Sequence, residues 1–299
     1  MTFDKRKVVY QIYPKSYKDT TGNGIGDLQG IIEKIPYLAK LGVDMVWLNP
    51  FYPSPQHDNG YDISDYTAVN PLFGSMDDFE EMIQVGKEYG IEFMLDMVLN
   101  HCSTEHEWFQ KALAGDNYYQ DFFFLRDEPT DWLSKFGGSA WAPFGDTGKY
   151  YLHLYDVTQA DLNWHNPRVR EELFKVVHFW LDKGVKGFRF DVINVIGKDE
   201  ILENCPENDG KPAYTDRPIV HEYLHMLNEE TFGTDEAIMT VGEMSATNIE
   251  NCILYTAPER HELSMAFNFH HLKVDYENGQ KWTLKNFDFE ELTLLYQFL

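Results

Sequence analysis

The chain has 299 residues, which is enough for one large domain or two ordinary ones with a sizeable core. It carries 25 Lys plus Arg against 49 Asp plus Glu, a formal net charge of −24, and such a field repels nucleic acid and anionic lipid. Three widely spaced cysteines match neither a disulfide framework nor a zinc site, and no signal peptide or long apolar span is found. These features predict a soluble, cytoplasmic protein without nucleic-acid or membrane partners.

Short apolar runs alternate with segments of helical period, a pattern typical of βαβ units and a parallel sheet. Strands are predicted at residues 8–13, 45–49, 92–98, 187–192, 238–243 and 263–268. The first three predicted helices are bounded by capping residues, which are Asp27 and Gly42, Ser75 with Asp78 and Gly90, and Asn166 with Pro167 and Gly184. The alternation predicts an α/β fold, either a barrel or a doubly wound sheet.

One connection is much longer than an ordinary βα loop: it joins the strand ending near Val98 to the helix starting at Pro167. It is rich in Tyr, Phe, Trp, Gly and Asp. This composition predicts an inserted subdomain over the carboxyl ends of the strands, which is the face where α/β proteins build their sites.

Polar residues end three of the predicted strands. They are Asp96 with Asn100 and His101, then Arg189 with Asp191, then Glu243. If these strands are neighbours in one parallel sheet, Asp191 and Glu243 project into one pocket. A pair of carboxyl groups carries out glycoside hydrolysis, because one attacks the anomeric carbon while the other protonates the leaving oxygen.

The surroundings of the two carboxyl groups suggest a role for each. Arg189 lies two residues before Asp191, on the same side of the strand, and favours its ionised form. Gly242 and Met244 give Glu243 an apolar setting, which favours its protonated form. Asp191 is therefore the predicted nucleophile and Glu243 the predicted acid/base.

Each motif alone also has a structural explanation. Arg189 and Asp191 could form an ion pair, Glu243 could cap a helix, and Asn100 with His101 could form a turn. Their occurrence at three successive strand ends favours the catalytic interpretation.

These motifs resemble the α-amylase family, glycoside hydrolase family 13, over essentially the whole chain. The matching segments are residues 59–62, 96–101, 159–164, 187–192 and 241–244. The resemblance implies a (β/α)₈ TIM barrel made of a first part at 1–100, an inserted B subdomain after strand 3 at 101–166, and a second part at 167–299. About six of eight strands are present. Strands 7 and 8, the family's Asn-His-Asp motif and its C-terminal β-domain are absent, which implies a C-terminally truncated chain of little activity.

The resemblance also implies a double displacement that retains the α-configuration, with Asp191 as nucleophile and Glu243 as general acid/base. The substrate-binding residues carried over are Tyr61 as a stacking platform, Asp62 and His101 as hydroxyl ligands, and Arg189 beside the nucleophile. Phe144 is similar to an aromatic residue at the mouth of the site, and the alternative is a place in the subdomain core.

Two longer segments, 150–164 and 263–276, resemble the branch of the family that hydrolyses trehalose 6-phosphate to glucose and glucose 6-phosphate through a covalent glucosyl-enzyme. A phosphorylated disaccharide needs a local cationic clamp on a chain of this charge, and Lys273 with Lys281 is the predicted one; ordinary solvated lysines are the alternative. Other possible functions are an oligo-1,6-glucosidase, a sucrose-isomerising relative and a non-catalytic homologue.

Residues 19–27 resemble the calcium loop of this branch, where oxygen ligands recur at alternate positions. The ligand positions are Asp19, Thr21, Asn23, Ile25 and Asp27. Only two of them are carboxylates, so a metal-free capped turn is the expectation, and no cofactor is required.

Overall fold

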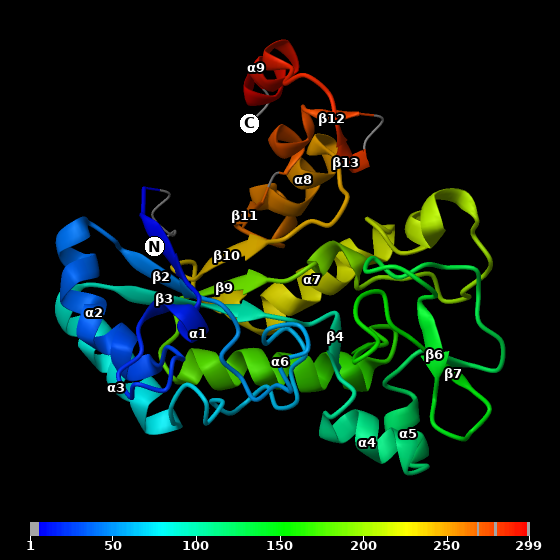
Figure 1. Ribbon diagram of the computed structural model, residues 1–299, viewed down its shortest axis with the longest axis horizontal. Coiled ribbons are helices and arrows are strands. Elements are labelled where there is room, and N and C mark those ends of the chain that lie inside the picture. Colours follow the sequence, from blue (N-terminus) through cyan, green and yellow to red (C-terminus); the bar gives the residue numbers. More distant parts are fainter. Residues whose placement is uncertain (1–5, 268, 278–279, 298–299) are drawn as a thin grey trace.

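A computed structural model describes residues 6–267, 269–277 and 280–297. Its centre is a parallel sheet of six strands in the order β1-β2-β3-β9-β10-β11 (Figure 1). The strands are β1 (Val9–Ile12), β2 (Met45–Leu48), β3 (Glu92–Met97), β9 (Gly187–Phe190), β10 (Met239–Gly242) and β11 (Met265–Ala266). All six predicted strands are confirmed as parallel neighbours in chain order.

Two strand ends differ from the prediction. β9 ends at Phe190, because Asp191 leaves the ladder and Val192 takes a positive φ of 40°. β11 has two residues, and Asn268 lies outside the described part of the chain.

The predicted helices form with the predicted caps. α2 (Leu28–Leu41) and α3 (Met76–Tyr89) begin at side-chain caps and end at glycines in the left-handed region, and α6 (Pro167–Asp182) begins at the Asn166 cap. These three helices cover the outer face of the sheet (Figure 1), α7 (Pro218–Glu230) follows β9 along the chain, and α8 (Ile249–Thr256) packs against β11. The short α1 (Pro14–Tyr17) follows β1.

Residues between β3 and α6 form a body at the carboxyl ends of the strands (Figure 1). Its elements are β4 (His101–Ser103), α4 (Glu107–Leu113), α5 (Asn117–Gln120), β5 (Leu125–Arg126), β6 (Trp141–Pro143), β7 (Tyr150–Leu152) and β8 (Gln159–Asp161). β4 pairs with β8, which sets His101 opposite Asp161, and β5, β7 and β6 form a second small sheet. The pairing of β4 with β8 therefore brings the last part of the insertion back beside its first part.

The remaining elements are short or lie near the end of the described chain. They are η1 (Ile193–Val195), η2 (Glu207–Ala213), η3 (Phe232–Thr234), η4 (Pro258–Arg260), η5 (His270–Lys273), β12 (Tyr276–Glu277), β13 (Gln280–Leu284) and α9 (Phe289–Gln297). Within the described ranges, no helix combines the length and the apolar character needed to cross a membrane.

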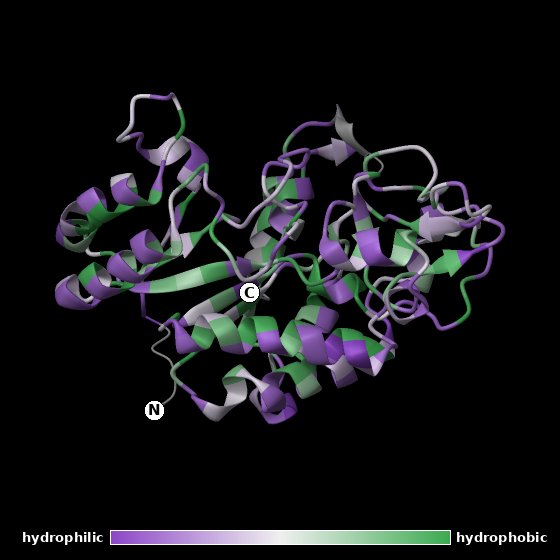
Figure 2. Ribbon diagram, turned by 90° about the horizontal axis from the view of Figure 1, so that it is seen from below, coloured by the Kyte–Doolittle hydropathy of each residue, from purple (hydrophilic) through white to green (hydrophobic). Residues whose placement is uncertain are grey.

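The two faces of the sheet are packed differently. Alternate strand residues such as Val46, Leu48 and Leu95 pack against the helices in the main core, and Figure 2 shows apolar residues along the strands and on the helices. The opposite face carries a smaller cluster of Met45, Met94, Met239 and Val241. Met94, Met239 and Val241, with Trp47 and Phe267 among others, line an apolar cavity of about 350 Å³.

Candidate active site

One buried arginine joins the three strand ends that the sequence singled out. The register sets Asp96 of β3 beside Arg189 of β9, and Arg189 beside Val241 of β10. Arg189 Nη1 donates to Asp96 Oδ1 at 2.6 Å and to Asp191 Oδ1 at 2.7 Å, and Nη2 pairs with Glu243. The predicted convergence of Asp191, Glu243 and Arg189 is confirmed.

The backbone at the ends of the strands aims the two carboxyl groups. The N–H of Asp191 donates to Met97 O at 2.9 Å, and the N–H of Glu243 donates to Phe190 O at 2.8 Å. Val192, which follows Asp191, is a β-branched residue at φ 40°. This backbone conformation costs energy and persists only where packing enforces it. Here Val192 is buried in a cluster with residues of the insertion.

The charges around Arg189 are unequal, since three carboxyl groups meet one guanidinium. Burial raises the pKa of Asp191, Arg189 opposes that rise, and the charge of Asp96 adds to it. The pKa of Asp96 is raised for the same reason, with Arg189 again opposing. Arg189 therefore favours the ionised form of Asp191, as predicted from the sequence, but burial outweighs it.

Glu243 does not have the apolar setting that its sequence neighbours suggested. Its side chain is 23% exposed and pairs with Arg189, whereas Met244 turns into the core and is 2% exposed. The prediction failed because residues that are adjacent along a strand end point in opposite directions.

Tyr61 and His101 lie at the same site. The Tyr61 hydroxyl donates to Asp96 Oδ2 at 3.0 Å, and the Arg189 guanidinium lies over the rings of Tyr61 and Trp47, 5.7 and 5.3 Å from their centres. His101 Nε2 lies 3.2 Å from Tyr61 O, and burial lowers the pKa of His101, which keeps the ring neutral. The ring of Tyr155 lies beside His101.

A second buried cation, which the sequence interpretation missed, holds His101 in place. Lys198 is fully buried, and its Nζ lies 2.9 Å from Asp161 Oδ1 and donates to Asn100 Oδ1 at 2.9 Å. Because an ammonium only donates, it fixes which end of the Asn100 amide is oxygen. Asn100 Nδ2 then donates to His101 Nδ1 at 3.1 Å, which leaves the His101 proton on Nε2, facing Tyr61 O.

The structure leaves the predicted role of Asp62 open and favours the core alternative for Phe144. Asp62 is fully buried and accepts hydrogen bonds from Ser54 and from the backbone of His57, so its role as a hydroxyl ligand stays a prediction. Phe144 is 1% exposed and packs edge-to-face on Phe109. A stacking platform needs an accessible face, so Phe144 belongs to the core of the insertion and not to the mouth of the site.

The predicted phosphate clamp of Lys273 and Lys281 stays a prediction. Lys273 is an exposed residue of η5, and within the described part of the chain no hydrogen bond or ion pair links it to Asp191 or Glu243. Lys281 belongs to β13, and its side chain lies outside the described residues.

The loop at 19–27 uses its acceptor oxygens internally. The Asp19 carboxylate accepts three main-chain N–H groups, those of Thr21, Gly22 and Gly24. Asp27 caps α2 through the N–H of Gly30, and Asn23 Oδ1 accepts from Ile25. Across the described residues, no group of three or more His, Cys, Asp or Glu is arranged to hold a metal ion. These side-chain oxygens accept hydrogen bonds within the turn, and whether the loop binds calcium stays a prediction for experiment.

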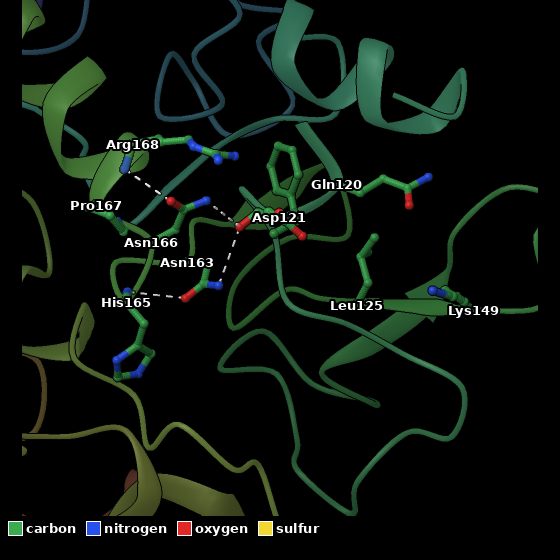
Figure 3. A pocket seen from close by; sticks show the side chains of 10 residues that line it. Gln120, Asp121, Leu125, Lys149, Asn163, His165, Asn166, Pro167 and Arg168 are labelled. Carbon is green, nitrogen blue, oxygen red and sulfur yellow. Dashed lines mark hydrogen bonds between the residues drawn. The ribbon is translucent and has the colours of Figure 1, made fainter. Parts of the chain in front are cut away.

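A separate concavity lies at the start of α6, between α5 and β5 (Figure 3). It is lined by Asp121, Asn163, His165 and Arg168 among others, and Asp121 O accepts from the amides of Asn163 and Asn166. It contains none of the predicted site residues and only one carboxyl group, so the chemistry remains at the strand ends.

Comparison with known proteins agrees with this geometry. The model of the α-amylase catalytic domain matches residues 11–297. The chain is 54% identical over 295 residues to trehalose-6-phosphate hydrolase of Bacillus subtilis (strain 168), covering 96% of this chain and 52% of that protein. It is 53% identical to the Escherichia coli (strain K12) trehalose-6-phosphate hydrolase, covering 97% and 53%, and 45% identical to the oligo-1,6-glucosidase of Bacillus cereus, covering 94% and 52%.

A solved structure is equally similar. The crystal structure of Bacillus licheniformis trehalose-6-phosphate hydrolase superposes with a TM-score of 0.94 at 54% identity, covering 98% of this chain and 54% of that one. The chain thus spans about half the length of the curated relatives it matches.

Asp191→Asn is expected to stabilise the fold at pH 7. The change removes one of three carboxylates around a single guanidinium, and the amide oxygen still accepts from Nη1. Because the pKa of Asp191 is raised on folding, the cost of its charge is present above that pKa and is lost as the pH falls through it. The gain in Tm over the unchanged protein should therefore shrink on acidification, as measured by circular dichroism at stepwise lower pH. The exposed Asp146→Asn is the control, and a lower Tm for Asp191→Asn at pH 7 would contradict the analysis.

Lys198→Met should cost about 3–5 kcal/mol of unfolding free energy, because it leaves Asp161 buried without its cation. Denaturant unfolding measures the loss. The double variant Lys198→Met/Asp161→Asn carries no unpaired charge and should recover part of it. If the loss of unfolding free energy in the double variant equals the sum of the losses in Lys198→Met and Asp161→Asn, the two residues are not coupled.

Removal of divalent metal should leave the Tm unchanged within about 1 °C, since a site that binds no metal gains nothing from mass action. Thermal unfolding with and without EDTA tests this. Asp19→Ala, which deletes the acceptor of three main-chain N–H groups, should lower the Tm in both conditions. A Tm that falls with EDTA and returns with calcium would overturn the metal-free interpretation.

Proposed function

This chain belongs to the α-amylase family, and from that premise we propose that it forms the catalytic centre of a retaining α-glucosidase that hydrolyses trehalose 6-phosphate to glucose and glucose 6-phosphate. The observation that carries the proposal is the pair of carboxyl groups, Asp191 and Glu243, held by the two Nη atoms of Arg189. A pair within the span of one guanidinium favours the separation of about 5–5.5 Å that double displacement uses, rather than the wider gap of inverting enzymes.

In the proposed reaction, Asp191 attacks the anomeric carbon while Glu243 gives a proton to the oxygen that leaves with glucose 6-phosphate. Glu243 then takes a proton from the water that hydrolyses the glucosyl-enzyme. Glu243 has the more exposed side chain of the two, which suits a group that exchanges protons with water, whereas Asp191 is held from behind by Arg189. His101 and Tyr61 would contact the glucose that is transferred.

The proposed substrate, trehalose 6-phosphate, is supported by the sequence identities to the relatives. The two trehalose-6-phosphate hydrolases are 53–54% identical to this chain, and the oligo-1,6-glucosidases are 44–46% identical at similar coverage. We also propose a cytoplasmic location, whose reducing conditions suit the free thiols of Cys102, Cys205 and Cys252.

The test is hydrolysis of trehalose 6-phosphate against isomaltose and trehalose by the full-length protein. We expect kcat/KM for the phosphate ester to exceed that of either neutral disaccharide by about 100-fold or more, the value of one well-placed charged contact. Preference for isomaltose would move the protein to the oligo-1,6-glucosidases and end the proposal on substrate.

Two variants control for the chemistry. Asp191→Asn should lower kcat on every substrate by about 10⁴-fold or more, as loss of a nucleophile does. Glu243→Gln should lose most on sugar leaving groups and least on aryl α-glucosides, whose phenolate leaves without a proton. Equal losses on both would argue against the acid role.

A further inference from the structure

The loop that carries Glu243 begins where the sheet ends, so it needs support from outside the strand ladder. β10 ends one residue before Glu243. The N–H of Glu243 donates to Phe190 O at 2.8 Å, and its carbonyl accepts from the N–H of Ile193 at 3.1 Å. Ser245 lies two residues further along and belongs to no strand. Its backbone is bound by a side chain, that of Asn194.

Asn194 binds both backbone groups of Ser245. The N–H of Ser245 donates to Asn194 Oδ1 at 2.7 Å, and Asn194 Nδ2 donates to Ser245 O at 2.9 Å. Because a backbone N–H only donates and a carbonyl only accepts, these contacts fix which end of the amide is oxygen. A primary amide offers a donor and an acceptor in one plane, as a peptide group does. The fully buried Asn194 therefore extends the pairing of β10 past its last residue.

Asp216 holds the Asn194 amide from its other side. Asn194 Nδ2 donates to Asp216 Oδ1 at 2.8 Å, and the N–H of Asp216 donates to Asn194 O at 3.1 Å. The same carboxyl group accepts at 2.7, 2.8 and 2.9 Å from three side chains that lie between β10 and the end of α8, namely Thr247, Asn251 and Tyr255. Asp216 therefore ties the Asn194 amide to the segment that follows the loop.

The side chain of Ser245 has a separate support in the insertion. Lys135 Nζ donates to Ser245 Oγ at 2.7 Å, and the N–H of Lys135 donates to Leu154 O at 2.8 Å. Since these contacts do not involve Asn194, a variant that loses the Asn194 donor is expected to shift the loop rather than release it.

We propose that Asn194 is a positioning residue for proton transfer by Glu243. The inference rests on the proposed function, through the acid/base role of Glu243, and is independent of which sugar leaves. Asn194 follows the nucleophile Asp191 by three residues, so its amide joins the segment of the nucleophile to the loop of the acid/base. A displacement of about 1 Å can cost a reaction about 100-fold in rate, and this two-bond contact opposes such a displacement.

The experiment compares Asn194→Asp with the unchanged full-length enzyme on two aryl α-glucosides. Aspartate keeps the size and the acceptor oxygen of Asn194 but cannot donate to Ser245 O. We expect kcat/KM to fall about 10- to 100-fold on phenyl α-glucoside, whose leaving oxygen needs a proton. On 4-nitrophenyl α-glucoside, whose phenolate leaves without one, it should fall less than about threefold. A purely structural role would lower both values by the same factor.

A second variant separates positioning from folding. Asn194→Asp/Asp216→Asn exchanges donor and acceptor, so the amide at position 216 can donate to the carboxylate at position 194, whereas Ser245 O still lacks its donor. This double variant should recover Tm lost by Asn194→Asp, as measured by circular dichroism, and should keep the selective loss on phenyl α-glucoside. Rates are compared per folded enzyme.

Asn228→Asp is the matched control. Asn228 Nδ2 donates to a backbone carbonyl, Glu262 O, at 2.9 Å, in a contact that does not involve the Glu243 loop. Its substitution should change kcat/KM on either glucoside by less than about twofold. Equal losses on both glucosides with the double variant would overturn the inference, and so would unchanged rates with Asn194→Asp.

Failure of the proposed function gives a different result. If Glu243→Gln loses equally on both glucosides, Glu243 is not the acid, and the assignment of Asn194 fails with it. If Glu243→Gln loses selectively on phenyl α-glucoside and the Asn194 variants do not, the proposed function stands and only the assignment of Asn194 fails.

Discussion

The structure depends on a buried guanidinium that is outnumbered by the carboxyl groups around it. Arg189 sits in the middle of the parallel sheet, where the register of β3, β9 and β10 fixes its neighbours, and its planar fork serves three carboxyl groups at once. A lysine could not hold them in the same geometry. The surplus of negative charge is costly in a buried place, and that cost is consistent with a site whose partner is the positive charge that develops on a sugar during glycoside cleavage.

A second layer, built around Lys198, orients the residues that surround this centre. Its ammonium group contacts Asp161 in the insertion, 37 positions away along the chain, and Asn100 after β3, 98 positions away. Lys198 therefore links these two regions. Through Asn100, this contact sets the tautomer of His101. The candidate site is therefore organised by two buried cations: Arg189 pairs with the proposed catalytic carboxyl groups, and Lys198 orders the polar groups around Asn100 and His101.

The sequence predicted the features that depend on residues close together along the chain. The caps at Asp27, Ser75 and Asn166 were readable, because a capping side chain bonds a backbone group three or fewer residues away. The convergence of Asp191 with Glu243 was readable too, since parallel strands end at one edge. The surroundings of Glu243, the burial of Phe144 and the contact of Lys135 with Ser245 were not, because each depends on residues brought together only by the tertiary fold. Lys198 left one sequence signal, a lysine that follows Gly197 after the mostly apolar segment 192–196.

The strained backbone at Val192 links the packing of the insertion to the position of Asp191, and so links substrate choice to reaction rate during evolution. Val192 has a positive φ and lies in a buried cluster with Trp132, Tyr155 and Tyr214, and the ring of Tyr155 also lies beside His101. A change in the insertion that admits a different sugar would also loosen the packing that aims Asp191. Lineages that diverge from this protein toward new substrates are thus expected to acquire compensating changes in that cluster, so that substrate choice and reaction rate change together.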